Sequence, residues 1–123
     1  MFQYPARILS VLDGDTLKLD IDLGFRAHIF ETVRLARIDT PEAVKFTLDG
    51  LVDPAKNYIL TNCPVNSFCV VGITRQEKYG RWLAELLYLP GESEPEKILI
   101  NPHVLNDELV RLGFAVSYAG GRK

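Results

Sequence analysis

A chain of 123 residues is long enough for one domain with its own core. Hydrophobic residues make up 47% and charged residues 24%, which argues against disorder, and no apolar run approaches the length that crosses a bilayer. The net charge of −2 excludes a surface covered in positive charge. Any binding to nucleic acid must therefore rely on a local cluster of arginines and a bound cation, with weak ground-state affinity and a salt-sensitive KM.

Strand patterns dominate the first half of the sequence. Arg7 to Leu12 is a short apolar run, and residues 17–23 alternate between apolar and polar side chains. Gly24 marks a bend, after which residues 29–38 are predicted to return antiparallel. The alternation slips at residues 36–38, which predicts a β-bulge there.

A helix is predicted from Pro54 to about Asn62, because Asp53 is a favoured N-cap and proline suits the first helical position. Two further strands are predicted at residues 68–74 and 82–89, and Trp82 is expected in the core.

The last part of the chain is predicted to hold an acidic hairpin tip and a second helix. The tip runs from Pro90 to Lys97. Asn106 is the expected N-cap of the helix, with Leu105, Leu109 and Leu112 on one face and Gly113 at its end. The order of three strands, a helix, two strands and a helix predicts a β-rich α+β domain.

The amino terminus shows no basic segment followed by an apolar stretch, so we expect a cytoplasmic protein, although a chain trimmed of a leader would look the same. Cys63 and Cys69 are too few for a disulfide framework and lack metal-ligand spacing, which favours free buried thiols over a bridge.

Three short motifs place carboxylates and guanidinium groups beside residues that bend or end strands. They are Val-Leu-Asp-Gly-Asp-Thr at residues 11–16, Val-Arg-Leu-Ala-Arg-Ile-Asp-Thr-Pro-Glu at 33–42, and Glu-Lys-Tyr-Gly-Arg at 77–81. Two carboxylates for a cation, a third for a water and two arginines for phosphate oxygens form the set of groups that phosphodiester cleavage needs.

Asp15 and Asp39 are the candidate metal ligands, because hard cations such as Ca2+ prefer oxygen donors. The alternative for the first motif is that Asp13 and Asp15 only shape a turn with Gly14. Glu42 follows Pro41, whose fixed φ stiffens the backbone, and so is the candidate general base.

Arg34 and Arg81 are the candidate phosphate clamp, since planar guanidinium groups hold phosphate oxygens with paired hydrogen bonds. The alternative for Arg34 is a buried ion pair with Asp39 or Glu42, and for Arg81 an exposed hairpin position. The alternative for Glu42 is a solvated loop glutamate.

These motifs, followed by Leu-Asn-Asp-Glu-Leu-Val-Arg-Leu-Gly at residues 105–113, resemble the thermonuclease family, also called staphylococcal nuclease-like domains. The resemblance spans residues 7–118 and implies a single domain over residues 1–123. The implied fold is a five-stranded Greek-key barrel of the OB-fold type with two short helices. The implied activity is Ca2+-dependent hydrolysis of DNA and RNA, with little base preference and 3′-phosphate products.

The resemblance also implies roles for individual residues and a preference for single-stranded nucleic acid as partner, with no membrane. Ca2+ would be held by Asp15, Asp39 and the carbonyl of Thr40, and the catalytic residues would be Arg34, Glu42 and Arg81. Substrate-binding residues would be Lys78, Tyr79 and Tyr118. Tyr118 would match the tyrosines near the carboxyl end of the family's domain that stack on bases.

The chain departs from the family pattern in one loop, and a function other than catalysis also stays open. Ala43 to Val52 is a mostly apolar loop in place of a lysine-rich one, and Phe46 could mark a contact surface for another subunit or a partner. The alternative to an enzyme is a catalytically silent OB-fold module that binds nucleic acid or protein, because OB-folds commonly bind single strands and some nuclease-like repeats keep the fold without the activity.

Overall fold

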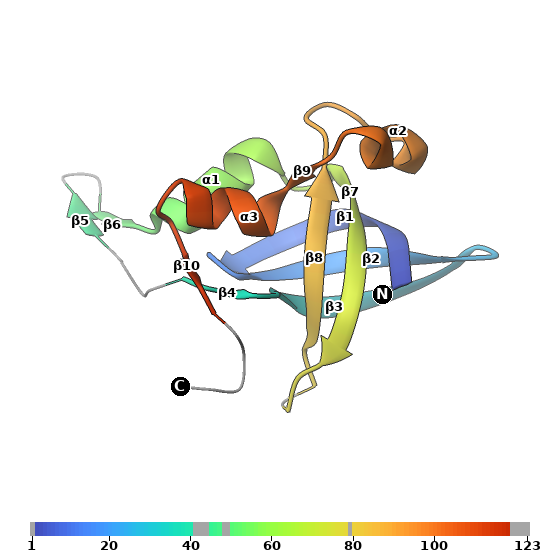
Figure 1. The fold of residues 1–123 in the computed structure, drawn as a ribbon, viewed down its shortest axis with the longest axis horizontal. Helices are drawn as coiled ribbons and strands as arrows, with labels where there is room; N and C mark the ends of the chain where they lie inside the picture. The colour runs from blue at the N-terminus through green and yellow to red at the C-terminus, as the bar shows by residue number, and fades with distance from the viewer. Residues whose placement is uncertain (1, 41–44, 48–49, 79, 119–123) are drawn as a thin grey trace.

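Five long strands curl into a closed barrel in the computed structural model (Figure 1). They hydrogen-bond in the order β3-β2-β1-β7-β8, and a parallel pairing between β3 and β8 closes the barrel. The other four pairings are antiparallel. The expected five-stranded OB-fold barrel is thereby confirmed. The structure describes residues 2–40, 45–47, 50–78 and 80–118, with backbone only for 45–47 and 50–52.

The predicted strands lie where the sequence pattern put them, with small shifts at their ends. The predicted return strand at residues 29–38 is instead divided in two by a turn at Ala36 and Arg37. The barrel strands are β1 (Phe2–Asp13), β2 (Thr16–Gly24), β3 (Ala27–Leu35), β7 (Phe68–Gln76) and β8 (Trp82–Tyr88).

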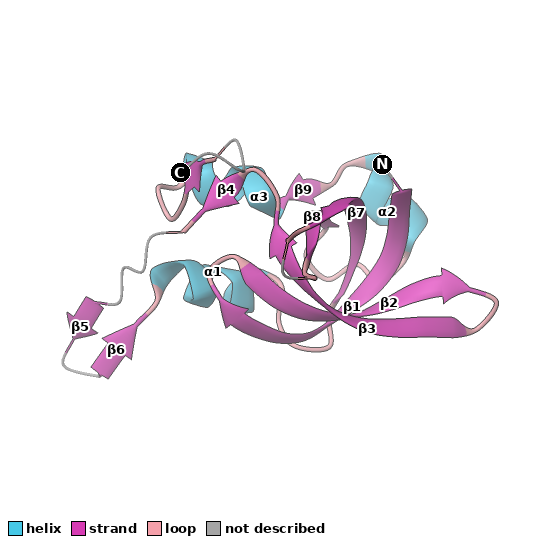
Figure 2. Cartoon of the chain, turned by 90° about the horizontal axis from the view of Figure 1, so that it is seen from below, coloured by secondary structure: helices cyan, strands magenta, loops and turns pink. Residues whose placement is uncertain are grey.

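Short strands extend this framework. β9 (His103–Val104) joins the free edge of β8, and β10 (Val116–Ser117) pairs with β4 (Ile38–Asp39). A separate hairpin projects from the barrel (Figure 2). It consists of β5 (Lys45–Thr47) and β6 (Gly50–Val52), and the side chain of Phe46, the proposed contact residue, lies outside the described part.

Helix α1 (Pro54–Asn62) forms as predicted and covers the end of the barrel beside the β1–β2 turn. The Asp53 side chain accepts a hydrogen bond from the Lys56 N–H at 3.1 Å, which confirms the expected N-cap. Ile59 is fully buried against the core. Among the described helices, none is long and apolar enough to cross a membrane.

The last third of the chain differs from the prediction in three ways. A third helix, α2 (Pro95–Ile100), begins inside the segment expected to be only an acidic tip. Helix α3 (Leu105–Arg111) starts two residues earlier than expected, because its N-cap is Val104 and not Asn106. Gly113 does end this helix region with a φ of 83°, but Leu112 is 45% exposed.

The barrel interior is filled by side chains that alternate along the strands. Cys63 and Cys69 are free and buried, as expected. Burial raises the pKa of the Cys63 thiol to about 12 and raises that of Cys69 further. The fully enclosed core residues include Ile8, Leu17, Leu19, Val33, Leu35, Ile59, Leu86, Leu105 and Leu109.

A polar network joins α1, β8, β9 and α3 through the buried carboxylate of Glu108. Its Oε1 accepts hydrogen bonds from the hydroxyls of Tyr58 and Tyr88, and its Oε2 lies 2.7 Å from His103 Nδ1. Burial alone would raise the pKa of Glu108, but the hydrogen bonds from Tyr88, His103 and Tyr58 hold it below its ordinary value.

Candidate functional site

Asp15 lies in the tight turn that the first motif forms, directly before β2. Its N–H donates a hydrogen bond to Asp13 Oδ1 at 3.1 Å, so Asp13 shapes this turn, as the turn interpretation expected of it. Asp15 itself does more than shape the turn, because its Oδ1 accepts a bond from the Thr16 hydroxyl and its Oδ2 faces two other elements.

Gly14 lets this turn sit tightly against its neighbours. A Cβ at Gly14 would lie 2.6 Å from the Cβ of Ala55 and 3.1 Å from Thr40 Oγ1. Ala55 belongs to the first turn of α1, and Thr40 follows β4. A glycine is therefore needed here for close approach, and the contact brings the second motif against the first.

Arg34 joins the two candidate metal ligands. Its Nη2 atom lies 3.2 Å from Asp39 Oδ1 and 3.5 Å from Asp15 Oδ2, and the Arg34 side chain is only 14% exposed. Since one nitrogen touches both carboxylates, their oxygen atoms are separated by no more than the sum of these two distances. The ion pair expected between Arg34 and Asp39 is present, and Asp15 extends it.

The backbone of Thr40 closes the group on its other side. The Thr40 N–H donates a hydrogen bond to Asp15 Oδ2 at 3.3 Å, which links the end of β4 to the start of β2. Burial raises the pKa of Asp15, and so do the hydrogen bond and negative charge of Asp13. A buried carboxylate beside another carboxylate is stabilised by an added positive charge.

The turn between Arg34 and Asp39 is held by residues outside the three motifs. Arg37 adopts a φ of 66°, and its guanidinium pairs with Glu85 on β8 and, at 2.9 Å, with Asp107 on α3. The sequence alone left open whether Arg37 contacts substrate or supports the fold, and these two ion pairs show that it supports the fold. Its position where the apolar alternation breaks was the available signal.

Asn106, on helix α3, also holds this turn in place and is completely buried. Its Nδ2 donates to the carbonyls of Ala36 at 2.9 Å and Ala84 at 3.0 Å, and its Oδ1 accepts from the Leu86 N–H at 2.9 Å. The capping pattern concealed this function, because a helix N-cap and a long-range bridge both favour asparagine. The turn that separates Arg34 from Asp39 is thus fixed to β8 and α3.

Tyr118 lies beside the candidate site through β10. Its N–H donates to the Arg37 carbonyl at 2.8 Å, and its ring centroid is 5.7 Å from Arg34 Cζ. This distance allows a cation–π contact. Tyr118 therefore borders the Asp15–Arg34–Asp39 group, and its expected stacking on a base stays a prediction.

The third motif is only partly described. Arg81 Nε lies 3.3 Å from Glu77 Oε1, and the Arg81 side chain is 39% exposed. The parallel register places Trp82 opposite Val33 and Leu83 opposite Arg34, so Arg81 precedes the paired residues of β8. Among the described residues, no hydrogen bond or ion pair joins Arg81 to the Asp15–Arg34–Asp39 group. Lys78 is exposed.

Two candidate site residues, Glu42 and Tyr79, lie outside the described residues. The structure therefore brings together Asp15, Arg34 and Asp39, with the Thr40 backbone and Tyr118 at the border of the group.

A scan against protein-family models matches residues 32–123 to the family described as staphylococcal nuclease homologue, about three quarters of the chain. The chain belongs to this family. Membership indicates nuclease-type function. No curated protein matched the chain in a sequence comparison. The matched region includes Arg34, Asp39 and Arg81, whereas Asp15 precedes it and is tied to the site by geometry alone.

The donor set fits the divalent cation on which nucleases of the staphylococcal nuclease family depend. Asp15 and Asp39 supply hard oxygen atoms, and together they carry one more formal charge than the guanidinium of Arg34 balances. Within the described residues, no cluster of three or more His, Cys, Asp or Glu side chains forms. Two carboxylates leave coordination positions for a backbone carbonyl, water and a phosphate.

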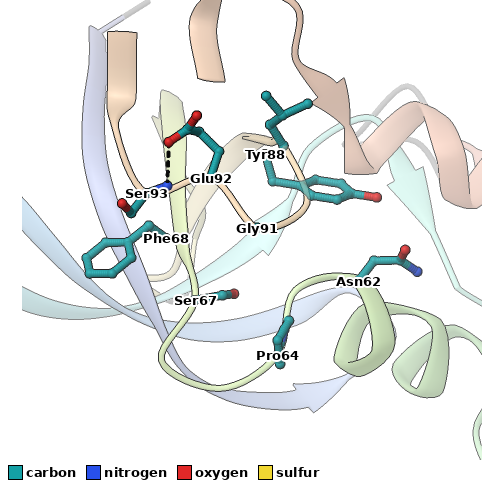
Figure 3. A pocket seen from close by; sticks show the side chains of 9 residues that line it. Asn62, Pro64, Ser67, Phe68, Tyr88, Gly91, Glu92 and Ser93 are labelled. Atoms are coloured by element: carbon teal, nitrogen blue, oxygen red, sulfur yellow. Dashed lines mark hydrogen bonds between the residues drawn. The ribbon is translucent and has the colours of Figure 1, made fainter. Parts of the chain in front are cut away.

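A cavity of about 210 Å³ lies away from this site, between the α1–β7 loop and the β8–α2 loop (Figure 3). Its carboxylate, Glu92, accepts hydrogen bonds from the N–H groups of Ser93 at 3.0 Å and Glu94 at 3.2 Å. The Glu92 carboxylate is held by its own turn, and the cavity shares no lining residue with the Asp15–Arg34–Asp39 group.

Proposed function

We propose that this chain is a Ca2+-dependent nuclease that hydrolyses phosphodiester bonds in DNA and RNA with little base preference and leaves 3′-phosphate ends. The observation that supports this proposal most is the convergence of the Asp15 and Asp39 carboxylates on the Arg34 guanidinium. Family membership supports the general class of reaction.

Asp15 and Asp39 would hold the cation, with the Thr40 carbonyl as a further oxygen donor. When bound, Ca2+ would polarise the phosphate and make a neighbouring water more acidic. The protein residues supply the remaining functions. Glu42 would accept the proton of the attacking water, helped by the stiff backbone that Pro41 imposes.

Arg34 would bind the non-bridging phosphate oxygens. Its side chain is already largely enclosed and oriented by two carboxylates, so little conformational entropy is lost when a phosphate binds. Charge grows on those oxygens in the transition state, so this hydrogen bonding lowers the barrier more than it tightens substrate binding.

Arg81 would be the second phosphate ligand and would exchange Glu77 for the substrate. Its side chain is partly exposed and forms one ion pair within the described part of the chain, so this exchange costs little free energy. The bond to the 5′ oxygen would break, leaving the phosphate on the 3′ side. Lys78 and Tyr79 would contact a terminal phosphate, and Tyr118 would stack on a base.

The cleavage assay uses a fluorescein-labelled single-stranded DNA and its RNA counterpart, each with Ca2+ or with EDTA. We expect cleavage only with Ca2+ and products that phosphatase treatment converts to 3′-hydroxyl ends. Arg34→Ala and Arg81→Ala should each lower kcat about 10²–10³-fold, the usual effect of losing one transition-state donor. Glu42→Gln should also abolish most activity.

Arg26→Ala is the matched control, since Arg26 is exposed at the β2–β3 turn, at the opposite end of β2 from Asp15. It should retain full activity. Cleavage that EDTA leaves unchanged would refute the metal mechanism. Binding of the oligonucleotide without cleavage would instead identify a silent binding module.

A further inference from the structure

The barrel is open at the end opposite α1. A cavity of about 350 Å³ lies there, within the size range of ligand sites. All five barrel strands contribute to it through residues on their inward face. The lining residues are Phe2, Tyr4, Ile21, Leu23, Ile29, Glu31, Ile73 and Trp82.

Glu31 is the one charged group in this lining. It shares the inward face of β3 with Ile29 and Val33, and its partner across the strand pair is the fully buried Leu19. Among the described residues, none forms a hydrogen bond or ion pair with the Glu31 carboxylate. A half-buried carboxylate beside aromatic rings costs free energy unless a cation or donor joins it.

The edge of β3 beside this cavity is also unpaired. Strand β2 pairs with β3 down to Ala27, but β8 pairs with it only at residues 33–35. Residues 27–32 therefore offer one open edge among the described strands, and the β2–β3 hairpin extends away from the barrel in Figure 2. This edge carries Phe30, which is 71% exposed. An apolar open edge is a template for an added strand.

We infer that the barrel mouth binds an extended segment of a partner protein, which adds to β3 at residues 27–32 and inserts an arginine side chain between Glu31, Tyr4 and Trp82. Charge complementarity selects a cation, because Glu31 is the only charged side chain among the described residues that line the cavity. Aromatic faces select arginine, because its weakly hydrated guanidinium stacks on rings and pairs with a carboxylate through two hydrogen bonds.

This site is separate from the Asp15–Arg34–Asp39 group. Adjacent residues of a strand point to opposite faces, so Glu31 and Val33 face inward while Arg34 faces the carboxylates. The inference does not depend on nuclease activity, and its test contains no nucleic acid.

The test measures fluorescence anisotropy of a labelled heptapeptide of alternating threonine and valine with a central arginine. We expect saturable binding, and a Kd at least tenfold weaker for peptides with central glutamine or glutamate. Backbone N-methylation of alternate residues should also weaken binding at least tenfold, since strand addition uses main-chain hydrogen bonds. Equal binding of the three unmethylated peptides would overturn the inference.

Protein variants give an independent outcome. Glu31→Gln should remove the preference for arginine over glutamine, whereas Glu96→Gln, the same change on the exposed surface of α2, should leave it intact. Amide NMR shifts caused by the peptide should map to residues 27–32 and to the Trp82 indole. A Glu31→Gln protein that keeps the preference, shifts confined to other strands, or a dimer of this chain formed through the β3 edge would each refute the proposed occupant.

Discussion

Replacing Asn106 by alanine should cost this fold about 3–5 kcal/mol, although the change removes only one small polar side chain. Of its three partners, the Ala84 carbonyl keeps a bond from the Ala36 N–H at 2.8 Å. The Leu86 N–H and the Ala36 carbonyl lose their partner and stay buried. An orphaned buried group costs about 1–3 kcal/mol, and the lost bonds and small cavity add the remainder.

The measurement is urea unfolding followed by the fluorescence of Trp82, the single tryptophan of the chain. Domains of this size have about 5–15 kcal/mol of stability in total, so the midpoint should fall far while the slope stays the same. In thermal unfolding the loss corresponds to roughly 10–20 °C.

Asn62→Ala is the matched control, because Asn62 makes one bond, from its Nδ2 to the Tyr58 carbonyl at 2.9 Å, at the end of α1. It should cost no more than about 1 kcal/mol. If the two variants lose stability equally, Asn106 does not fix the turn between Arg34 and Asp39 as we have argued.

Three further predictions concern packing and pH. Gly14→Ala should lower the free energy of unfolding by about 1–3 kcal/mol, because the new Cβ would lie 2.6 Å from that of Ala55. The same change should weaken Ca2+ binding measured by calorimetry, since Gly14 also packs against Thr40 at the candidate site. Unchanged Ca2+ affinity would contradict a role for this packing in bringing the two motifs together. Burial raises the pKa of Cys63 to about 12, so Ellman's reagent at pH 8 should react with this thiol only in urea. The contribution of the neutral Cys63 thiol to the free energy of unfolding should be complete below pH 9 and should decline as the pH rises from about 9 to 12. The pKa of Glu108 is lowered in the folded protein, so its ionised carboxylate stabilises the fold above the unfolded pKa of 4.5, and this stabilisation is lost as the pH falls through the folded pKa. Glu108→Gln should therefore reduce the loss of unfolding free energy at acidic pH. An unchanged acid dependence in this variant would exclude Glu108 as its source.

Local signals were sufficient for much of this fold. Asp53 and Pro54 set the start of α1 because a cap and the first helical position depend on adjacent residues alone. Alternation located the barrel strands for the same reason, since it reflects the two faces of each strand.

The parts that sequence reasoning missed depend on contacts between distant segments. Asn106 bonds to residues 20 and more positions away, so its local capping pattern gave the wrong function. Arg37 occupies a left-handed turn that Glu85 and Asp107 support, a conformation that the alternation pattern described only as a bulge. Neither relation is visible before the barrel closes.

The candidate site shows the same division. The residue types of Asp15, Arg34 and Asp39 follow from the motifs, but their convergence depends on Gly14 packing against Thr40. The sequence also gave no sign that Arg81 pairs with Glu77, because such an ion pair depends on how the hairpin folds back.

Strand β3 connects the two sites that we propose, and its pairing limits how they can influence each other. An added peptide would extend the sheet along residues 27–32, where β8 makes no pair. The parallel pairs at residues 33–35 would remain, so the barrel would stay closed and Arg34 would keep its contacts with both carboxylates. Because those pairs fix the backbone of Arg34, the proposed phosphate ligand, saturating peptide should leave kcat for a short oligonucleotide unchanged. A fall in kcat would show that peptide binding at residues 27–32 also moves Arg34.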